Sequence, residues 1–388
     1  VLKAHKVEIN PTPEQKQKIH QTIGVCRFIY NFYLSYNKEI YEKEKRFVSG
    51  MNFSKWLNNE FILNNPEYKW IKEVGSKAVK QAIMNGEKAF KRFFDGKSKF
   101  PKFKKKKNQN IKCYFPKNSK MDIFVERHRV KIPTFGFIKL KEFGYIPEKC
   151  TVKSVTVSFK AGRYYVSVLV EQEKQTLSNN NTEGLGIDLG IKDLAIVSNI
   201  DNPFKNINKT IKVKKLEKKL KREQRKLSRK YESLKVKIKA KEDATRQNIS
   251  KQIVIVQKLH QRISNIRVNH VNQVVNEIVK TKPSYITIED LNVRGMMKNR
   301  HLSKAIAGQC FNQFREKLNN KRKTNGFELR IVDRFYPSSK LCSCCGFIKK
   351  DLKLSDRIYK CNNCNSTIDR DKNASINLKN AKVYKVAA

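Results

Sequence analysis

The sequence has few acidic residues. Asp and Glu number 35 against 84 Lys and Arg, so the formal net charge of the 388 residues is +49. A protein with such an excess of one charge repels itself unless a polyanion compensates it. Small acidic substrates do not require this excess, whereas the closely spaced phosphates of a nucleic acid do. The shortage of acids therefore points to a nucleic-acid partner.

Long apolar runs are absent as well. A membrane-spanning helix needs roughly 18 or more apolar residues in succession, and no segment of the chain approaches that length. No short apolar segment of the signal-peptide type follows the first ten residues, VLKAHKVEIN. We therefore expect a soluble, cytoplasmic protein that contacts no membrane. With 39% hydrophobic residues, the chain is long enough to form two or three domains with a sizeable core.

Cysteines are few in most of the chain and crowded near its end. Four of the nine are scattered, at positions 26, 113, 150 and 310, as expected of buried thiols in a reducing compartment. The other five lie between residues 342 and 364. Two CxxC pairs in this stretch are 15 residues apart, a spacing typical of a four-thiolate zinc site. We predict one structural Zn²⁺ ion, held by Cys342, Cys345, Cys361 and Cys364.

The residues around these cysteines fit the prediction. Gly346 and Asn365 follow the second and fourth cysteines of the set, where the turn of a zinc knuckle favours a positive φ. Cys344 is left over, although a Cys342-x-Cys344 pairing stays open. Four thiolates leave no position for water, so the site is expected to be structural.

The first 175 residues read as strands around a helical insertion. A strand at residues 2–9 precedes a breaker at 10–13, and helices are expected at about 13–45, 53–63 and 76–94. The pattern then changes to a period of two, which predicts strands within 129–172. Together these patterns predict a small antiparallel sheet or β-barrel with an inserted helical block. Residues 175–182 are polar and read as a linker.

The remainder has the pattern of an α/β domain. Short apolar strands are expected at 184–190, 194–198, 285–291 and 328–333. They are separated by a basic helix at about 212–239, a second helix at about 244–280 and a third at about 303–324. A last short helix is expected from about residue 372.

Three carboxylates in this half stand out by their context. Asp188 lies between apolar residues within a strand, where an isolated charge is costly unless it binds something. Glu289 ends a strand at the edge where α/β sites open, and Asp371 begins the last helix. Acids without Cys or His partners favour hard cations such as Mg²⁺ or Mn²⁺. Two such ions, roughly 3.5–4 Å apart, can hydrolyse a phosphodiester.

A structural interpretation competes for each acid taken alone. Asp369 and Asp371 can cap the last helix, and Asp193 and Asp290 can be ordinary loop acids. As a set on an α/β scaffold in a basic protein, Asp188, Glu289 and Asp371 are better explained as metal ligands, with Asp369 as possible support.

Basic segments are the candidate nucleic-acid contacts. Eleven of the nineteen residues from Lys212 to Lys230 are Lys or Arg, a stronger bias than the mixed charges of an ordinary solvated helix. Residues 100–107 interleave lysines with aromatic rings, which suits a single strand or an RNA backbone. Amides on the third helix, including Asn85, can read base edges or be plain surface groups. The candidates are Lys77, Gln81, Lys102, Lys104, Lys105, Lys106, Lys107, Lys215, Lys219, Arg222 and Arg225.

Three motifs resemble, in order and content, the TnpB family of transposon-encoded RNA-guided nucleases, relatives of type V CRISPR effectors. They are GIDLGIKDLAIVS (186–198), ITIEDLNVRGM (286–296), and SSKLCSCCG…YKCNNC…DRDKNASINL (338–378). FPKFKKKK (100–107) and the first strand and helix are also similar to that family. The departures are Asn365 for the usual glycine, Ser375 for a common alanine, and the additional Cys344.

The resemblance implies an RNase-H-like (RuvC) nuclease domain with an inserted zinc ribbon, preceded by a wedge β-barrel that carries a helical recognition lobe. The catalytic carboxylates would be Asp188, Glu289 and Asp371. The implied domains are the first barrel strand (1–12), the recognition lobe (13–98), the rest of the barrel (99–178), the first two RuvC segments (183–336), the zinc ribbon (337–367) and the third RuvC segment (368–388).

The implied activity is RNA-guided cleavage of double-stranded DNA beside a short flanking motif, by hydrolysis that uses two Mg²⁺ or Mn²⁺ ions. The partners would be a guide RNA from the transposon end and the target DNA, with the protein a monomer or a weak dimer in a prokaryotic cytoplasm, associated with the nucleoid when bound to DNA. The alternative is a transposase or accessory protein that acts directly on transposon ends without RNA. A guided repressor and a junction-type endonuclease are further alternatives.

Overall fold

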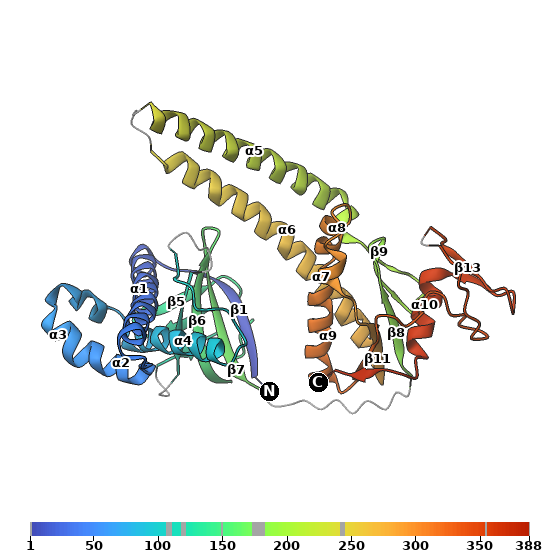
Figure 1. Cartoon of the computed structure of the whole chain (residues 1–388), viewed down its shortest axis with the longest axis horizontal. Coiled ribbons are helices and arrows are strands. Elements are labelled where there is room, and N and C mark those ends of the chain that lie inside the picture. Colours follow the sequence, from blue (N-terminus) through green and yellow to red (C-terminus); the bar gives the residue numbers. More distant parts are fainter. Residues whose placement is uncertain are drawn as a thin grey trace. The chain divides into compact units, whose positions relative to one another are not determined.

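The computed structural model describes residues 2–105, 111–117, 122–148, 150–172, 183–240, 245–353 and 355–387. The chain divides into two compact units, Val1–Glu173 and Lys174–Ala388, coloured blue to green and green to red in Figure 1. A search of the described residues finds no helix with the length and apolar character needed to cross a bilayer. Each unit has its own hydrophobic core.

The first unit contains a seven-stranded antiparallel sheet with the strand order β2-β6-β7-β1-β5-β4-β3. Strand β1 lies at its centre and pairs with β7 from Leu2↔Glu171 to Ile9↔Tyr164. The alternating pattern of the sequence buries one face of each long strand. The strands are β1 (Leu2–Asn10), β2 (Ile111–Pro116), β3 (Phe124–Val125), β4 (Arg129–Ile132), β5 (Gly136–Leu140), β6 (Thr151–Lys160) and β7 (Arg163–Glu171).

A helical block is inserted between β1 and β2. Helix α1 begins with a capping box in which Thr12 and Gln15 satisfy each other's backbone. The ring of Tyr33 on α1 packs against Gly86 of α4, where a Cβ atom would lie 2.5 Å from the ring. The block contains α1 (Pro13–Glu44), α2 (Gly50–Trp56), the π-helical turn η1 (Leu57–Phe61), α3 (Ile62–Asn64), the 3₁₀ helix η2 (Pro66–Glu73) and α4 (Ser76–Phe94).

These elements confirm an antiparallel sheet interrupted by helices. Closure of the sheet into a barrel stays a prediction, because no pairing among the described residues joins the edge strands β2 and β3. The predicted linker at 175–182 lies outside the described residues.

The second unit contains a six-stranded mixed sheet with the order β10-β9-β8-β11-β12-β15. Strands β8 to β10 form an antiparallel meander, and β11 runs parallel to both β8 and β12. This combination confirms the α/β character expected from the sequence. The strands are β8 (Leu185–Leu189), β9 (Asp193–Val197), β10 (Phe204–Lys205), β11 (Tyr285–Glu289), β12 (Glu328–Val332) and β15 (Lys385–Val386).

Helices cover the two faces of this sheet. The last turns of α6 (Gln247–Lys280) and the helix α9 (Phe311–Asn325) supply Val275, Ile278 and Phe314 to the core on one face. Helix α10 (Arg370–Lys379) contacts β8 and β11 and lies on the other side of the strands in Figure 1. The remaining elements of this unit are η3 (Ile207–Lys209), α7 (Val293–Met296), α8 (Ser303–Gln309) and the ribbon strands β13 (Ile358–Lys360) and β14 (Thr367–Asp369).

The helix predicted over 303–324 is wrong as a single helix. Cys310 adopts a left-handed conformation with φ 59° and divides the segment into α8 and α9. The break lets the buried side chain of Gln309 donate to the carbonyls of Gly190 and Ile191, just after β8. Side-chain hydrogen bonding to a distant loop thus overrides a helical pattern that is locally continuous.

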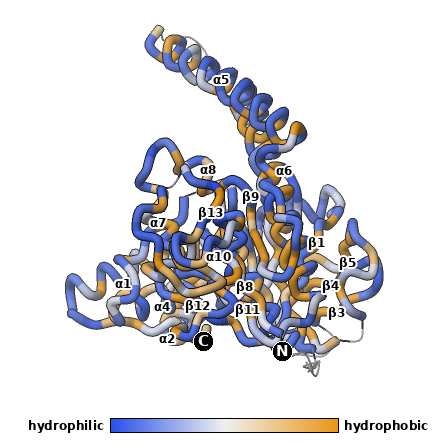
Figure 2. Tube along the Cα trace, turned by 90° about the vertical axis from the view of Figure 1, so that its right-hand side faces the viewer, coloured by the Kyte–Doolittle hydropathy of each residue, from blue (hydrophilic) through white to orange (hydrophobic). Residues whose placement is uncertain are grey.

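The basic helix α5 (Ile211–Lys239) and α6 form an antiparallel hairpin that projects from the sheet (Figure 2). Leu216, Leu259 and Ile263 form a small buried apolar cluster between the two helices. Other buried apolar residues of the hairpin are Val213, Leu234, Ile249 and Val256. Glu223 is also buried there, and it accepts a hydrogen bond of 2.9 Å from Gln252. Most other α5 side chains are exposed and hydrophilic.

Candidate functional site

Two of the candidate carboxylates are brought together by neighbouring parallel strands. The register of β8 and β11 pairs Gly186 with Thr287 and Ile187 with Ile288. Asp188 and Glu289 occupy the next positions, so they lie side by side at the carboxyl ends of the two strands. Residues paired across a sheet point to the same face. Both side chains are half-buried.

Helix α10 brings the third carboxylate to the same face. A Cβ atom on Gly186 would lie only 1.9 Å from the carbonyl oxygen of Ser375, so glycine is needed for the helix to pack directly on β8. Asp188 is two residues further along the strand, about 6.6 Å, and Asp371 is four residues before Ser375, about 6 Å. The hydroxyl of Tyr285, at the start of β11, donates to the carbonyl of Lys379, so α10 runs antiparallel to β11 and Asp371 approaches Asp188.

The electrostatics agree with this proximity. Burial and, after it, the neighbouring charges of Glu289 and Asp371 together raise the pKa of Asp188 to about 8. Burial also raises the pKa of Glu289, against the effect of a hydrogen bond donated by Ser338. Arg370 lies 3.1 Å from Asp371 and offsets part of the charge. Clustered acids of this kind are costly unless a cation or a proton neutralises them.

Asp369 serves as the N-cap of α10. Its carboxylate accepts hydrogen bonds of 3.0 Å from the backbone N–H groups of Asp371 and Lys372. The capping role considered for Asp369 is therefore present in the structure. Asp371 does not cap; it lies in the first turn, with its carboxylate near Arg370 and Arg357.

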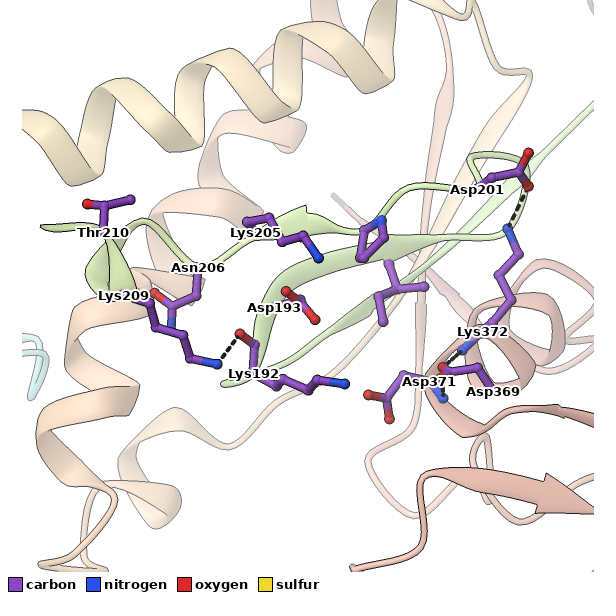
Figure 3. A pocket seen from close by; sticks show the side chains of 12 residues that line it. Lys192, Asp193, Asp201, Lys205, Asn206, Lys209, Thr210, Asp369, Asp371 and Lys372 are labelled. Atoms are coloured by element: carbon purple, nitrogen blue, oxygen red, sulfur yellow. Dashed lines mark hydrogen bonds and ion pairs between the residues drawn. The ribbon is translucent and has the colours of Figure 1, made fainter.

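A cavity of about 710 Å³ opens beside Asp371 (Figure 3). Asp369 and Asp371, at the start of α10, line one side. The other side is lined by Lys192 just before β9, Lys205 of β10 and Lys209 of η3. Lys372 spans the two, because its ammonium group donates to the carbonyls of Val197 and Ile200. Asp188 and Glu289 do not line this cavity. Its polar lining is Lys192, Asp193, Asp201, Lys205, Asn206, Lys209, Thr210, Asp369, Asp371 and Lys372.

Four cysteines form a second, tighter cluster. Within the described ranges, a search for three or more His, Cys, Asp or Glu side chains that could hold a metal ion finds this group, and its donor atoms all lie within 4.8 Å of one another. The Sγ atoms of Cys342 and Cys364 are 3.7 Å apart, and those of Cys345 and Cys361 are 3.6 Å apart. A tetrahedral site with Zn–S bonds of about 2.3 Å has edges of about 3.8 Å. The donor set therefore fits a structural metal ion.

The turns around the cysteines match the sequence expectation. Gly346 has φ +78° and Asn365 has φ +55°, and both follow a cysteine of the set. The hydroxyl of Ser366 lies 3.3 Å from the Sγ atom of Cys342 and 3.2 Å from that of Cys364, and it is the main cause that lowers the pKa of Cys364 to about 6. Cys344 is exposed and lies outside the set.

The candidate nucleic-acid contacts in the first unit have mixed surroundings. Lys77 forms an ion pair with Asp122, and the amide of Gln81 donates to Asn85 within the helix. The ammonium group of Lys104 lies 3.6 Å from the centre of the Tyr30 ring. Lys102 and Lys105 are exposed, whereas Lys106 and Lys107 lie outside the described residues.

The candidates on α5 share one environment. Lys215, Lys219, Arg222 and Arg225 are all exposed on the projecting hairpin. Arg222 lies 3.5 Å from the buried Glu223. The helix therefore presents a nearly continuous basic surface to solvent.

Several polar residues near the carboxylates carry no signal that the sequence interpretation used. The hydroxyl of Ser338 donates to Glu289, and the buried amides of Asn373 and Asn377 hold the segment that contains Ser338. Two asparagines four residues apart on a short helix are the only sequence hint. Asp290 proves to be an ion-paired loop acid, 2.8 Å from Arg315 and 3.2 Å from Arg334.

Three family models match parts of the chain. Residues 311–378 match the model described as "Cas12f1-like, TNB domain", residues 1–46 match a "Helix-turn-helix domain", and residues 167–300 match a "Probable transposase" of the IS605 OrfB type. In this structure the second model covers one strand and one long helix, so its name does not describe the conformation here.

The chain is also similar to whole proteins. It is 30% identical to a Streptomyces pristinaespiralis protein named "Putative RNA-guided DNA endonuclease", over 97% of this chain and 89% of that one. InsQ of Escherichia coli K12, which carries the same description, is 29% identical over 97% and 91% of the two chains. A Cas12f1 chain, solved by cryo-EM with sgRNA and target DNA, shares the fold with a TM-score of 0.59 at 14% identity, over 99% of each chain.

Proposed function

The chain belongs to the TnpB family of transposon-encoded proteins, and we propose that it is an RNA-guided DNA endonuclease. A guide RNA from the transposon end would pair with the target DNA, while the protein reads a short flanking motif. The two relatives reported above carry this activity in their names, and the similarity extends over nearly the whole of each chain.

One observation carries the chemical part of the proposal. Asp188 and Asp371, the first and last of the three carboxylates, are 183 residues apart in sequence. Asp188 and Glu289 nevertheless lie at the carboxyl ends of the central strands β8 and β11, and α10 packs on the same face of the sheet with Asp371 in its first turn. Folding gains no stability from gathering these acids, because each raises the cost of ionising Asp188. A binding role for divalent cations explains the arrangement.

In this proposal the three carboxylates hold two Mg²⁺ or Mn²⁺ ions, with Asp369 fixing the first turn of α10. When bound, such ions lower the pKa of an attacking water and stabilise the charge on the leaving 3′ oxygen. A pair of ions needs ligands spread over both of them, and three carboxylates from two strands and a helix can supply such a set. Arg370 limits the repulsion between the acids before cations bind.

The fold supports a RuvC-like assignment for this unit. An antiparallel meander of three strands is extended by two parallel strands that are reached through helices, and carboxylates at the central strands are the expected position for an RNase-H-like site. The Cys₄ cluster would hold Zn²⁺, since its sulfur separations fit that ion. The domain boundaries 1–12, 13–98, 99–178, 183–336, 337–367 and 368–388 belong to the same proposal.

The nucleic acids would lie along the basic surfaces, foremost the α5–α6 hairpin. Neutralising Lys215, Lys219, Arg222 and Arg225 together should weaken RNA binding uniformly across sequences. It should also reduce the salt slope of log K against log [salt] by about 0.7–0.9 per lost phosphate contact. The four side chains are exposed, so the fold should tolerate their replacement by glutamine.

The decisive experiment is to express the chain with the DNA that flanks its gene, purify it, and sequence the RNA that accompanies it. A bound transcript that ends in transposon-flank sequence, and cleavage redirected by changing that sequence, are the expected results. Asp188→Ala and Glu289→Ala should abolish cleavage and leave guided binding intact. Cleavage or joining of transposon ends that survives RNase treatment would instead identify the alternative, a transposase that needs no guide.

A further inference from the structure

Glu289 has a hydrogen-bond partner that belongs to the segment leading into the cysteine cluster. The hydroxyl of Ser338 donates to Oε1 of Glu289. Ser338 is only 6% exposed, and the bond joins residues 49 positions apart. A donor on one carboxylate oxygen fixes the rotamer of the carboxyl group and leaves the other oxygen for a second ligand.

Ser338 is itself held by α10. The side-chain amide of Asn377 donates to the carbonyl of Ser338 at 2.8 Å and to that of Leu341 at 2.6 Å. The backbone between these two residues is closed by hydrogen bonds from the N–H groups of Lys340 and Leu341 to the carbonyl of Pro337. The turn that presents Ser338 therefore has little freedom.

A second amide on the same helix extends this clamp to the cysteine cluster. Asn373, one turn before Asn377, donates to the carbonyl of Leu341 at 2.7 Å and accepts from the N–H of Ser343 at 3.0 Å. Cys342 lies between these two anchored residues and is 3% exposed. Asn373 is fully buried, where an unsatisfied amide would be costly.

We propose that Ser338 is a positioning residue for Glu289, and that Asn373 and Asn377 make the first cysteine knuckle part of the support of the carboxylate site. Helix α10 thereby holds Asp371 through its own backbone and Glu289 through the knuckle turn. The role of Ser338 rests on the proposed function, because it presumes that Glu289 binds a divalent cation.

The test measures cation binding without relying on cleavage. Mn²⁺ that binds the folded chain raises its melting temperature, because binding adds RT ln(1 + [Mn²⁺]/Kd) to the free energy of unfolding. We expect Ser338→Ala to raise the Mn²⁺ concentration needed for a given rise in melting temperature by about 10- to 100-fold, as is usual when a partner of a ligand is removed. Ser338→Thr keeps the hydroxyl and should restore the response. Asn377→Asp loses the donating amide, so it should also raise the Mn²⁺ concentration that is needed, as Ser338→Ala does.

Two controls separate this effect from damage to the fold. Ser355→Ala removes an exposed serine of the same ribbon, bonded weakly to Asp356 at 3.5 Å, and should leave the Mn²⁺ response unchanged. The zinc content of Ser338→Ala, measured by elemental analysis, should equal that of the wild type, because Ser338 is not a ligand. A lowered zinc content would attribute the effect to loss of the ribbon and overturn the positioning role.

The outcomes also distinguish this inference from the proposed function. If Asp188→Asn removes the Mn²⁺ response but Ser338→Ala leaves it unchanged, the carboxylate site stands and the positioning role of Ser338 is wrong. If the wild type and Asp188→Asn respond equally to Mn²⁺, the cation site itself is wrong, and the role of Ser338 fails with it.

Discussion

The second unit contains two clusters of metal-type ligands that differ in how the chain builds them. The four cysteines lie within 23 residues of sequence, and their donor atoms meet within 4.8 Å. The three carboxylates come from two strands and a helix, and the first and last are 183 residues apart in sequence. A local cluster of this kind suits a closed, structural site. A site assembled across the sheet suits ligands that must share more than one ion with a substrate.

The two clusters also differ in their cost to the fold. In the cysteine cluster, hydrogen bonds from Ser366 favour the thiolate of Cys364. At the carboxylates, burial and neighbouring acids oppose the charge of Asp188. In the first cluster local donors favour the thiolate of Cys364, although the pKa of Cys361 is raised to about 11. In the second cluster the shift of Asp188 reflects burial and repulsion between acids. The second arrangement is the one expected of the proposed cation site, because perturbed pKa values cluster at functional sites.

The largest expected effect comes from Asp188→Asn, which keeps the shape of the side chain and removes its charge. Cleavage should fall by at least about a thousandfold, because the residue is proposed to hold the cations directly. In buffer free of divalent ions, the same variant should melt at a higher temperature than the wild type, because a repelled acid has been replaced. A cleavage assay checks the predicted loss of activity, and calorimetry of the same variant checks the predicted rise in melting temperature. A variant that is both inactive and less stable would contradict the contrast drawn above.

The pH dependence of stability should show the same repulsion. The pKa of Asp188 rises from 3.8 to about 8 on folding, so between these values the folded state holds a proton that the unfolded chain has lost. Its contribution to the free energy of unfolding is therefore fully present below pH 4. It declines as the pH rises to about 8, by up to about 1.4 kcal/mol per pH unit. Denaturant unfolding of the wild type and of Asp188→Asn, without divalent ions, isolates this slope as their difference. Parallel curves would show that Asp188 ionises freely.

Removal of one cysteine of the cluster should lower the stability of the fold, whereas removal of the Asp188 charge should raise it. Cys361 is 1% exposed, and Cys361→Ser removes one of four ligands. We expect loss of the bound metal and a fall of about 3 kcal/mol or more in the free energy of unfolding, because metal binding stabilises such a ribbon directly. Elemental analysis and calorimetry measure both. The matched variant Cys344→Ser changes an exposed cysteine outside the set, and its metal content and stability should equal those of the wild type.

The same contrast explains how much the sequence could predict. The cysteine ligands and their two positive-φ turns follow from spacing within one short segment, and the strands around Asp188 and Glu289 follow from apolar patterns. Ser338 could not be found in this way, because its partners are Glu289 and Asn377, 49 and 39 residues away. A hydroxyl has no periodic signature. The ion pair of Lys77 with Asp122 and the helix break at Cys310 were missed for the same reason, since tertiary contacts decide both.

The smallest expected effect belongs to Asp290, the immediate neighbour of Glu289. Its carboxylate is paired with Arg315 at 2.8 Å and Arg334 at 3.2 Å, and these guanidinium groups lower its pKa. Exposed pairs of this kind contribute about 1 kcal/mol or less, so Asp290→Asn should reduce stability slightly and leave cleavage close to that of the wild type. Glu289→Gln, one residue earlier, should abolish cleavage. Equal losses of cleavage in the two variants would contradict this prediction. They would show that cleavage depends on the total negative charge of Glu289 and Asp290, and not on the position of the Glu289 carboxylate beside Asp188 and α10.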